Sequence, residues 1–385
     1  MGAYKSRYDV FQISNSEDVN KYCSQNNVNE RKEGALNVNN DQDNGEDSLI
    51  RARRERGDQG TSEIELSYGG EEDLRHHFKA CQKNPGHQKF LRADQFTVSD
   101  LPARYQGDDE LIDFISSLLK LTVRVSVKHV SDQRPKTYPN TDQIYPCYDH
   151  SDKNLLRTGS GWISGVKKRF GKKGKIHCTC RDCQLSPDPE ATFAEIYINT
   201  ATVVVFDGIE GAHTTCHLFY DNDAALDKCQ DVITLNGMSS VDSDIVSNTC
   251  LMTYVTHNMH LAERLLNIWQ QGQTAHKTLM AKCSNDREKM LRASIRQGFQ
   301  DAEHTLAVIV SHPHGCSKHI SFGDYTKRQT FSPAYSQYTY STATCPGCSG
   351  ALVYVLGNTQ LVFDHAHVGC REGVQTLGYS SYGLD

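Results

Sequence analysis

Ser349 is the residue whose surroundings most clearly indicate chemistry. It lies in the segment Cys345-Pro346-Gly347-Cys348-Ser349-Gly350-Ala351, and an apolar strand is expected directly after it. A Gly-x-Ser-Gly turn directs the backbone N–H groups of Gly347 and Ser349 toward one point, while the serine hydroxyl projects from the tip. This pattern is typical of a nucleophile beside an oxyanion hole. In the alternative interpretation, Ser349 is a small residue in a tight glycine-rich turn.

Three other motifs occur in an order that matches a known fold. They are Gly159-Ser160-Gly161-Trp162-Ile163, the segments 308–315 and 320–323, and His365-Ala366-His367-Val368-Gly369. Together with Ser349 they resemble the trypsin-like (chymotrypsin-fold) serine peptidases, especially the intracellular and viral branches, over residues 111–385. The resemblance implies an all-β fold of two six-stranded barrels with a peptide-binding cleft. It also implies that His365 and His367 line the substrate pocket, with His367 receiving an acidic or amide side chain.

The resemblance places a general-base histidine after the strand at 194–198, in a Thr-Ala-x-His-Val pattern. The chain reads Thr200-Ala201-Thr202-Val203-Val204, so Val203 stands where the histidine is expected. The carboxylate that orients this histidine is expected just before residue 250, where the chain has Asn248. A serine hydroxyl is not usefully deprotonated near neutral pH without a positioned base. We therefore expect catalysis to be impaired.

Other residues near these positions have the right chemistry to compensate. Asp242 and Asp244 lie just upstream of Asn248, and His213 and His217 follow the Val203 segment. The leading interpretation is a pseudoprotease, which binds a peptide or protein ligand in its cleft as a regulatory module. The alternative is an active intracellular serine endopeptidase that uses Ser349 with another base. A third hypothesis is a regulatory protein that binds zinc and nucleic acid.

A dense group of cysteines suggests a metal site. Cys-x-Cys-x-x-Cys with an adjacent imidazole supplies three or four soft ligands for a structural Zn²⁺, at His177, Cys178, Cys180 and Cys183. The next expected strand adds Cys216 and His217. The alternative is a hairpin with reduced cysteines that pack as small hydrophobes. Cys345 and Cys348 form the other close pair, but a metal there would compete with the oxyanion geometry. Peptidase chemistry of this kind requires no cofactor.

A basic stretch precedes these cysteines, at Lys167, Lys168, Arg169, Lys172, Lys173 and Lys175. It has the charge to bind phosphate or nucleic acid, but no aromatic residues are interleaved with it. The whole chain carries 41 Lys+Arg against 47 Asp+Glu, a formal charge of −6, which argues against a general nucleic-acid coat. We expect a solvated hairpin tip and no nucleic-acid partner.

The 385 residues allow two or three domains. Residues 1–70 are poor in apolar residues without periodicity, which predicts a disordered tail. Residues 71–107 are a mixed segment without a clear pattern, and residues 108–385 form the peptidase-like domain. Asp108 and Asp109 precede an amphipathic helix that is followed at 121–127 by a strand with one buried face. Two apolar helical faces predict a two-helix insertion at about 257–302.

The chain has no apolar run of transmembrane length, and its first residues lack the apolar stretch of a secretory signal. We expect a soluble cytoplasmic protein in which most of the 14 cysteines are reduced or bind metal. The start Met1-Gly2-Ala3-Tyr4-Lys5-Ser6 fits a myristoylation pattern with Gly2 as the acceptor. One acyl chain would give only weak membrane association.

Overall fold

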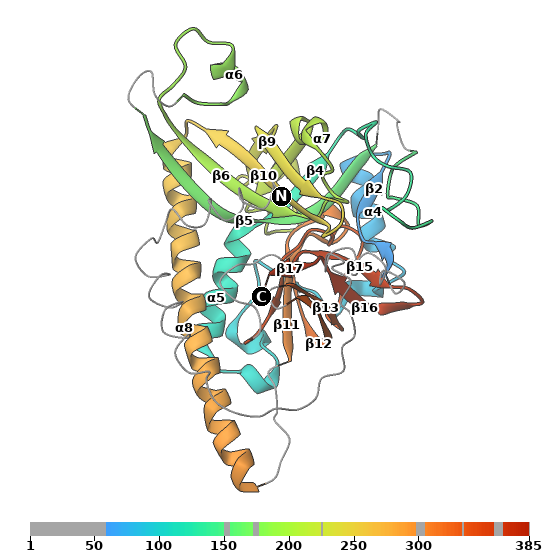
Figure 1. Cartoon of the computed structure of the whole chain (residues 1–385), viewed down its shortest axis with the longest axis vertical. Helices are drawn as coiled ribbons and strands as arrows, with labels where there is room; N and C mark the ends of the chain where they lie inside the picture. The colour runs from blue at the N-terminus through green and yellow to red at the C-terminus, as the bar shows by residue number, and fades with distance from the viewer. Residues whose placement is uncertain are drawn as a thin grey trace, which may run out of the picture. The chain divides into compact units, whose positions relative to one another are not determined.

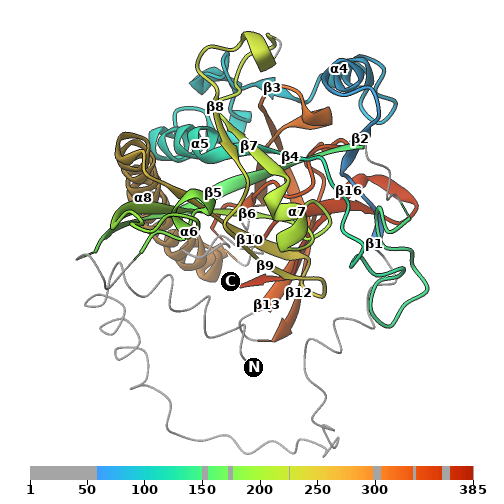
Figure 2. The same ribbon diagram turned by 90° about the horizontal axis from the view of Figure 1, so that it is seen from above.

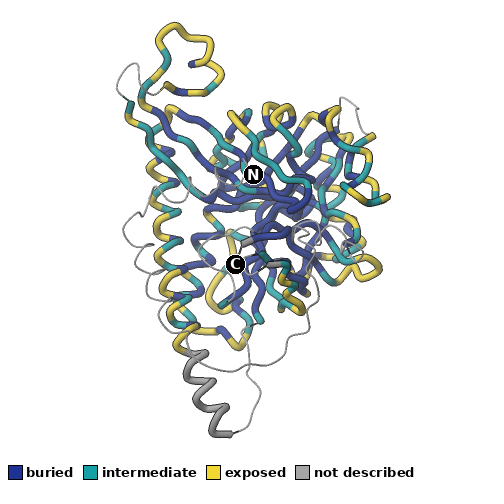
Figure 3. Tube along the Cα trace, viewed as in Figure 1, coloured by how far each residue is buried: buried dark blue, intermediate teal, exposed yellow. Residues whose placement is uncertain are grey.

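The computed structural model describes residues 59–149, 155–171, 177–224, 226–297, 305–332, 335–357 and 365–384. All of them belong to one compact unit, Asp47–Asp385. Two antiparallel sheets make up most of this unit (Figure 1). Buried residues run through both sheets and along the inner side of the helices (Figure 3).

The first sheet has eight strands in the order β8-β7-β4-β5-β6-β10-β9, and β2 pairs with β5. Its strands are β2 (Glu65–Ser67), β4 (Thr122–Val127), β5 (Leu156–Phe170), β6 (Thr192–Thr200), β7 (Thr214–Leu218), β8 (Ile233–Asn236), β9 (Ser240–Asp244) and β10 (Thr249–Thr256). Valine, isoleucine and threonine are frequent in these strands, as expected for residues that pack well on a pleated surface.

The second sheet has nine strands in the order β1-β15-β16-β13-β12-β11-β14, with β17 on β13 and β3 on β12. Its strands are β1 (Gln59–Ser62), β3 (Leu91–Arg92), β11 (Leu306–Ser311), β12 (His319–Ser332), β13 (Tyr335–Tyr340), β14 (Val353–Val355), β15 (His367–Arg371), β16 (Val374–Ser380) and β17 (Gly383–Leu384). The prediction of a mainly β fold is confirmed by these two antiparallel sheets. The expected strand at 360–363 lies outside the described residues.

The helices occupy the connections between strands. The α-helices are α4 (Glu71–Lys79), α5 (Asp109–Leu121), α6 (Arg181–Gln184), α7 (Gly208–Ala212) and α8 (Met259–Gln297). The 3₁₀ turns are η2 (Pro85–His87), η3 (Val98–Asp100), η4 (Ala103–Tyr105), η5 (Leu226–Lys228) and η6 (Pro313–Gly315).

The predicted helix and strand after Asp108 are confirmed. The Asp108 side chain accepts a hydrogen bond from the Leu111 N–H and caps α5, whose apolar face is buried. Strand β4 follows directly, but both of its faces are buried rather than one. Arg124 lies on the face expected to be polar and exposed. Its Nη2 donates to both carboxylate oxygens of Glu71 in α4, each at 2.9 Å. The segment before residue 108 therefore covers this part of the sheet.

The predicted two-helix insertion is wrong, because α8 is one continuous helix of 39 residues. Two such helices would be expected to meet at Gln271-Gly272-Gln273. Gly272 is instead buried inside the helix, where α8 runs beside α5 (Figure 2). A Cβ at Gly272 would lie 3.1 Å from the Ser117 Cβ of α5. The glycine thus allows close helix packing rather than a turn.

The predicted disordered tail is wrong from Gln59 onward. Strand β1 pairs with β15, and β2 pairs with β5. Glu63 and Glu65 lie here with exposures of 4% and 7%, so the segment buries polar rather than apolar side chains. Its order comes from hydrogen bonds to sheet edges and from ion pairs, which an apolar pattern does not reveal. The rest of the predicted tail, residues 1–58, lies outside the described residues.

Candidate functional site

The Gly347–Ser349–Gly350 turn lies between β13 and β14 and requires its glycines. Gly347 and Gly350 have φ angles of +92° and +89°, which side chains rarely adopt. A Cβ on Gly347 would lie 2.6 Å from the His312 carbonyl oxygen, and one on Gly350 would lie 2.2 Å from the Ser160 carbonyl oxygen. The Ser160 N–H donates to the Ser349 carbonyl at 2.8 Å. The motifs expected to surround Ser349 are therefore brought together there.

The backbone N–H groups of this turn converge on a peptide carbonyl of the chain itself. The carbonyl oxygen of Glu63 accepts hydrogen bonds from Gly347 N–H at 2.7 Å and from Ser349 N–H at 3.1 Å. The Glu63 N–H donates to the Val368 carbonyl at 2.9 Å. Residues 59–62 continue antiparallel to β15, with Ser62 opposite Gly369. The segment before Glu63 thus lies along the turn as an extended peptide.

The Glu63 carboxylate is buried and bound by two basic groups. Its Oε2 lies 2.7 Å from His367 Nε2, and its Oε1 pairs with the Lys83 ammonium. Burial alone would raise the pKa of Glu63, but the hydrogen bond and charge of His367 and the charge of Lys83 lower it to about 2. Glu63 is therefore ionised at neutral pH.

His367 is positioned for this contact by Tyr340, whose hydroxyl lies 2.6 Å from His367 Nδ1. Burial lowers the pKa of His367. Both ring nitrogens of His367 are thus engaged, Nε2 by the Glu63 carboxylate and Nδ1 by the Tyr340 hydroxyl. His365, the second predicted pocket residue, instead lies against Ser380 Oγ at 3.4 Å and packs edge-on against the Tyr338 ring.

Ser349 Oγ donates to the Val368 carbonyl at 2.6 Å. Throughout the described ranges, no imidazole or carboxylate forms a hydrogen bond with this hydroxyl. Val203 and Asn248 do meet: the Val203 N–H donates to Asn248 Oδ1 at 3.3 Å, and Asn248 has a φ of +58°. Their expected correspondence to a missing base and its orienting residue stays a prediction. Neither side chain can accept a proton from serine at neutral pH.

The other expected bases do not contact Ser349 Oγ. His213 is exposed and packs against the His129 ring. Burial, together with the charges of Arg124 and Lys128, lowers the pKa of His217 to about 3. The Asp244 carboxylate instead accepts hydrogen bonds from the residues of the next turn.

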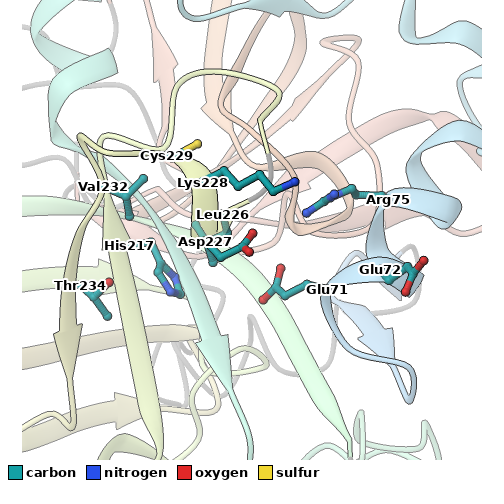
Figure 4. A pocket seen from close by; sticks show the side chains of 10 residues that line it. All are labelled: Glu71, Glu72, Arg75, His217, Leu226, Asp227, Lys228, Cys229, Val232 and Thr234. Carbon is teal, nitrogen blue, oxygen red and sulfur yellow. The ribbon is translucent and has the colours of Figure 1, made fainter.

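His217 borders a pocket of about 600 Å³ that lies apart from the turn and between α4 and the β7–β8 connection (Figure 4). Arg75 and Lys228 line it together with the acidic groups of Glu71 and Asp227. Ser349 does not line this pocket. The mixed charges favour no single class of ligand.

A buried ionic network holds the backbone at Val203 and was not predicted. Glu210 accepts from Arg134 Nε at 2.6 Å and from Arg157 Nη2 at 2.6 Å, and all three side chains have no exposure. Arg134 and Arg157 also donate to the carbonyl oxygens of Val203 and Val204 at 3.2 and 2.8 Å. Burial would raise the pKa of Glu210, but the two guanidinium groups lower it.

The predicted cysteine cluster forms, with a different histidine. His257 Nε2 lies 3.0 Å from Cys178 Sγ, 3.8 Å from Cys180 Sγ and 3.5 Å from Cys183 Sγ. His257 directly follows β10, far from the cysteines in sequence. His177 is exposed and does not belong to this group. Three thiols and an imidazole are a donor set that Zn²⁺ prefers, so the cluster is compatible with a metal.

The remaining predicted features are only partly described. Gly2 and residues 172–176 lie outside the described residues. Lys168 pairs with Glu263 and Arg169 pairs with Glu195, so this part of the basic stretch has protein partners. None of the helices in the described ranges combines the length and hydrophobicity needed to cross a bilayer.

The chain matches no protein-family model and no curated protein. Among solved structures it is similar to the Rv3671c protease from M. tuberculosis in its active form, at 10% identity and a TM-score of 0.32, over 70% of this chain and 78% of that one. It is also similar to the serine endoprotease from Yersinia pestis, at 10% identity and a TM-score of 0.31, over 70% of this chain and 61% of that one.

Proposed function

We propose that this protein is a serine-peptidase homologue without peptidase activity, whose cleft binds an extended peptide with glutamate beside Ser349. One observation carries the proposal: the Glu63 carbonyl receives both turn N–H groups, while the Ser349 hydroxyl donates to the Val368 carbonyl instead of to a base. A peptide carbonyl held in this way is polarised for attack. Without a proton acceptor the attack does not follow.

The chemistry that is missing is proton transfer. A serine attacks a carbonyl as its proton passes to a base, and the same base later protonates the leaving amine. The Ser349 hydroxyl points its proton at a peptide carbonyl, which is far too weak a base. Loss of the base lowers peptidase rates by several powers of ten and leaves only the effects of binding and the oxyanion hole. The Glu63–Ile64 bond is therefore stable in its own cleft.

The chemistry of the cleft selects its ligand. Peptide backbone is held by the β15 edge and by the turn, and a carboxylate is held by His367 and Lys83. Residues 59–63 meet these requirements as an internal ligand. A partner protein would present an extended segment with glutamate at the same position, and it would have to displace β1.

A fluorophosphonate probe tests whether Ser349 is activated. Because Glu63 occupies both turn N–H groups in the native chain, the decisive variant is Glu63→Ala, which removes the carboxylate that His367 and Lys83 hold and so loosens the internal ligand. We expect neither the native chain nor Glu63→Ala to be labelled. Labelling of Glu63→Ala that is abolished in Glu63→Ala/Ser349→Ala would overturn the proposal. It would identify an active endopeptidase that is blocked by its own chain.

We also propose that Cys178, Cys180, Cys183 and His257 hold a structural Zn²⁺. The supporting observation is the convergence of His257 Nε2 on the three sulfurs, within distances that one tetrahedral ion spans. The metal would fasten the hairpin after β5 to the end of β10. Zinc analysis of matched histidine variants tests this proposal and is described below.

A further inference from the structure

A second group of metal-ligand side chains lies beside the Ser349 turn. It contains Cys81, His87, His314 and Cys345, with one ligand atom from each lying within 4.8 Å of the others. All four residues are buried, with exposures of 7%, 6%, 4% and 0% in this order. Two thiols and two imidazoles are a donor set typical of structural zinc.

The distances fit one tetrahedral ion. Zn–S bonds of about 2.3 Å and Zn–N bonds of about 2.0 Å place two sulfur ligands about 3.8 Å apart and a sulfur and a nitrogen about 3.5 Å apart. Cys81 Sγ lies 3.6 Å from Cys345 Sγ, and Cys345 Sγ lies 3.5 Å from His87 Nε2. The distance between the Cys81 and Cys345 sulfurs also exceeds the S–S length of a disulfide, which is about 2.05 Å.

His314 carries the strongest sign of a missing ligand. Its Nδ1 lies 2.6 Å from Glu65 Oε2, while its Nε2 is buried without a hydrogen-bond partner. A histidine that binds metal through one nitrogen usually donates its other N–H to a carboxylate. Glu65 supplies that carboxylate, and an ion among the four residues would satisfy Nε2.

The surroundings hold the other donors in place. The His87 ring stacks on Phe78 with 3.9 Å between centroids. The Asn84 backbone N–H points at Cys81 Sγ at 3.4 Å, and Asn84 Nδ2 lies 3.1 Å from Cys345 Sγ. Such N–H contacts stabilise thiolates, the form in which cysteine binds metal.

We propose that these four residues bind one Zn²⁺, and that this ion fixes the N-terminal segment over the Ser349 turn. Cys81 and His87 lie in the connection that follows β2 and α4. His314 lies in η6 and Cys345 lies two residues before Gly347. One ion thus joins the segment that places Glu63 and Lys83 to the loops that receive them. Metal binding does not depend on the proposed function, whereas the effect on β1 rests on the contacts of Glu63 with the Ser349 turn described above.

Metal content of the full chain, purified without added metal, tests the site. We expect Cys81→Ala/His87→Ala to lose about one equivalent of zinc relative to the native chain. Cys216→Ala is the matched control, because Cys216 is equally buried and belongs to neither cluster; it should lose none. Unchanged zinc in Cys81→Ala/His87→Ala, or no bound zinc in the native chain beyond that removed by Cys178→Ala/Cys180→Ala, would overturn the proposal.

Two further measurements leave all four proposed ligands in place, so they do not depend on whether the ligand variants fold. Co²⁺ exchanged into Cys178→Ala/Cys180→Ala should give the visible absorption of a tetrahedral site with two thiolates. A Cys81–Cys345 disulfide, found by peptide mapping under non-reducing conditions in freshly purified protein, would overturn the proposal. Both results are independent of whether Ser349 is catalytic.

The effect on β1 is measured separately by limited proteolysis. Chelation of the native chain should speed cleavage within residues 59–72 at least tenfold, whereas chelation of Cys81→Ala/His87→Ala should not speed it further. If residues 59–72 resist proteolysis equally before and after removal of the zinc bound by the Cys81–His87–His314–Cys345 group, the ion does not hold this segment. That result would overturn this part of the proposal.

Discussion

The backbone carbonyl of Glu63 lies 2.7 Å from the amide nitrogen of Gly347, although 284 positions separate the two residues in the chain numbering. This contact places a bond of the protein's own N-terminal region beside its serine. The same residue is held at its carboxylate by His367. The proposed peptide-binding site and its proposed internal ligand can therefore be tested together within one chain.

Rebuilding the base should make the protein cut itself. In Val203→His/Asn248→Asp, a histidine held by a carboxylate would replace two residues that already contact each other. We expect slow cleavage of the Glu63–Ile64 bond, seen as a new N-terminus at Ile64 by sequencing and mass spectrometry. Val203→His alone should cleave far less, because Asn248 cannot fix the imidazole tautomer. Cleavage that persists after adding Ser349→Ala would contradict the prediction.

Glu63→Gln should loosen β1 and remove a pH dependence. The carboxylate has a pKa of about 2 in the folded chain against an ordinary 4.5, so its stabilisation is complete above about pH 4.5 and is lost as the pH falls toward 2. Removing one partner of a buried pair costs about 3–5 kcal/mol. We expect less stability at pH 7 and a flatter acid limb in urea titrations. A parallel downward shift at every pH would contradict this assignment.

Glu210→Ala should destabilise the first sheet, because it leaves Arg134 and Arg157 buried without their carboxylate. The expected loss is about 3–5 kcal/mol in the free energy of unfolding. The control is Glu263→Ala, which removes the partially exposed pair with Lys168 and should cost about 0–1 kcal/mol. Because the folded pKa of Glu210 is lowered, its contribution should begin to decrease below about pH 4.5 and be lost as the pH falls through the folded pKa. Chemical denaturation at pH 7 and pH 4 measures both effects.

The two histidines beside the first cysteine cluster should differ in zinc binding. His257→Ala removes a ligand, so we expect it to lose about one equivalent of zinc and to melt at a lower temperature. His177→Ala is the matched control and should keep both its metal and its stability. Equal zinc content in the two variants would contradict the proposed site and would favour the interpretation of Cys178, Cys180 and Cys183 as ordinary reduced cysteines.

Features that depend on local sequence were predictable. Asp108 and the apolar spacing after it predicted α5, and the glycine-flanked Ser349 turn predicted converging N–H groups. Features that depend on distant partners were not. When the sequence is read alone, Gly272 indicates a break in the helix. In the structure it lies beside Ser117 and allows α8 to pack closely against α5. His257 could not be linked to Cys178 across 79 positions without the β5–β6–β10 pairing.

The N-terminal segment shows the same limitation more strongly. Residues 59–67 have few apolar side chains, and their order depends on β15, β5, His367 and Lys83. Polar side chains that are buried against matched partners look like those of a solvated tail when the sequence is read alone. The buried ionic network of Glu210, Arg134 and Arg157 could not be predicted from the sequence for the same reason.

Because β1 is part of the same chain as the site it contacts, any separate peptide must compete with a tethered segment for that site. A tethered ligand acts at an effective concentration that is often in the millimolar range, so a free peptide of equal intrinsic affinity competes poorly. Tyr68, which is 58% exposed, and Gly69 and Gly70 lie between β2 and α4. A single cut there would turn the proposed internal ligand into a separate chain that dilution can remove, and the β15 edge and the N–H groups of the Ser349 turn would become available to other proteins.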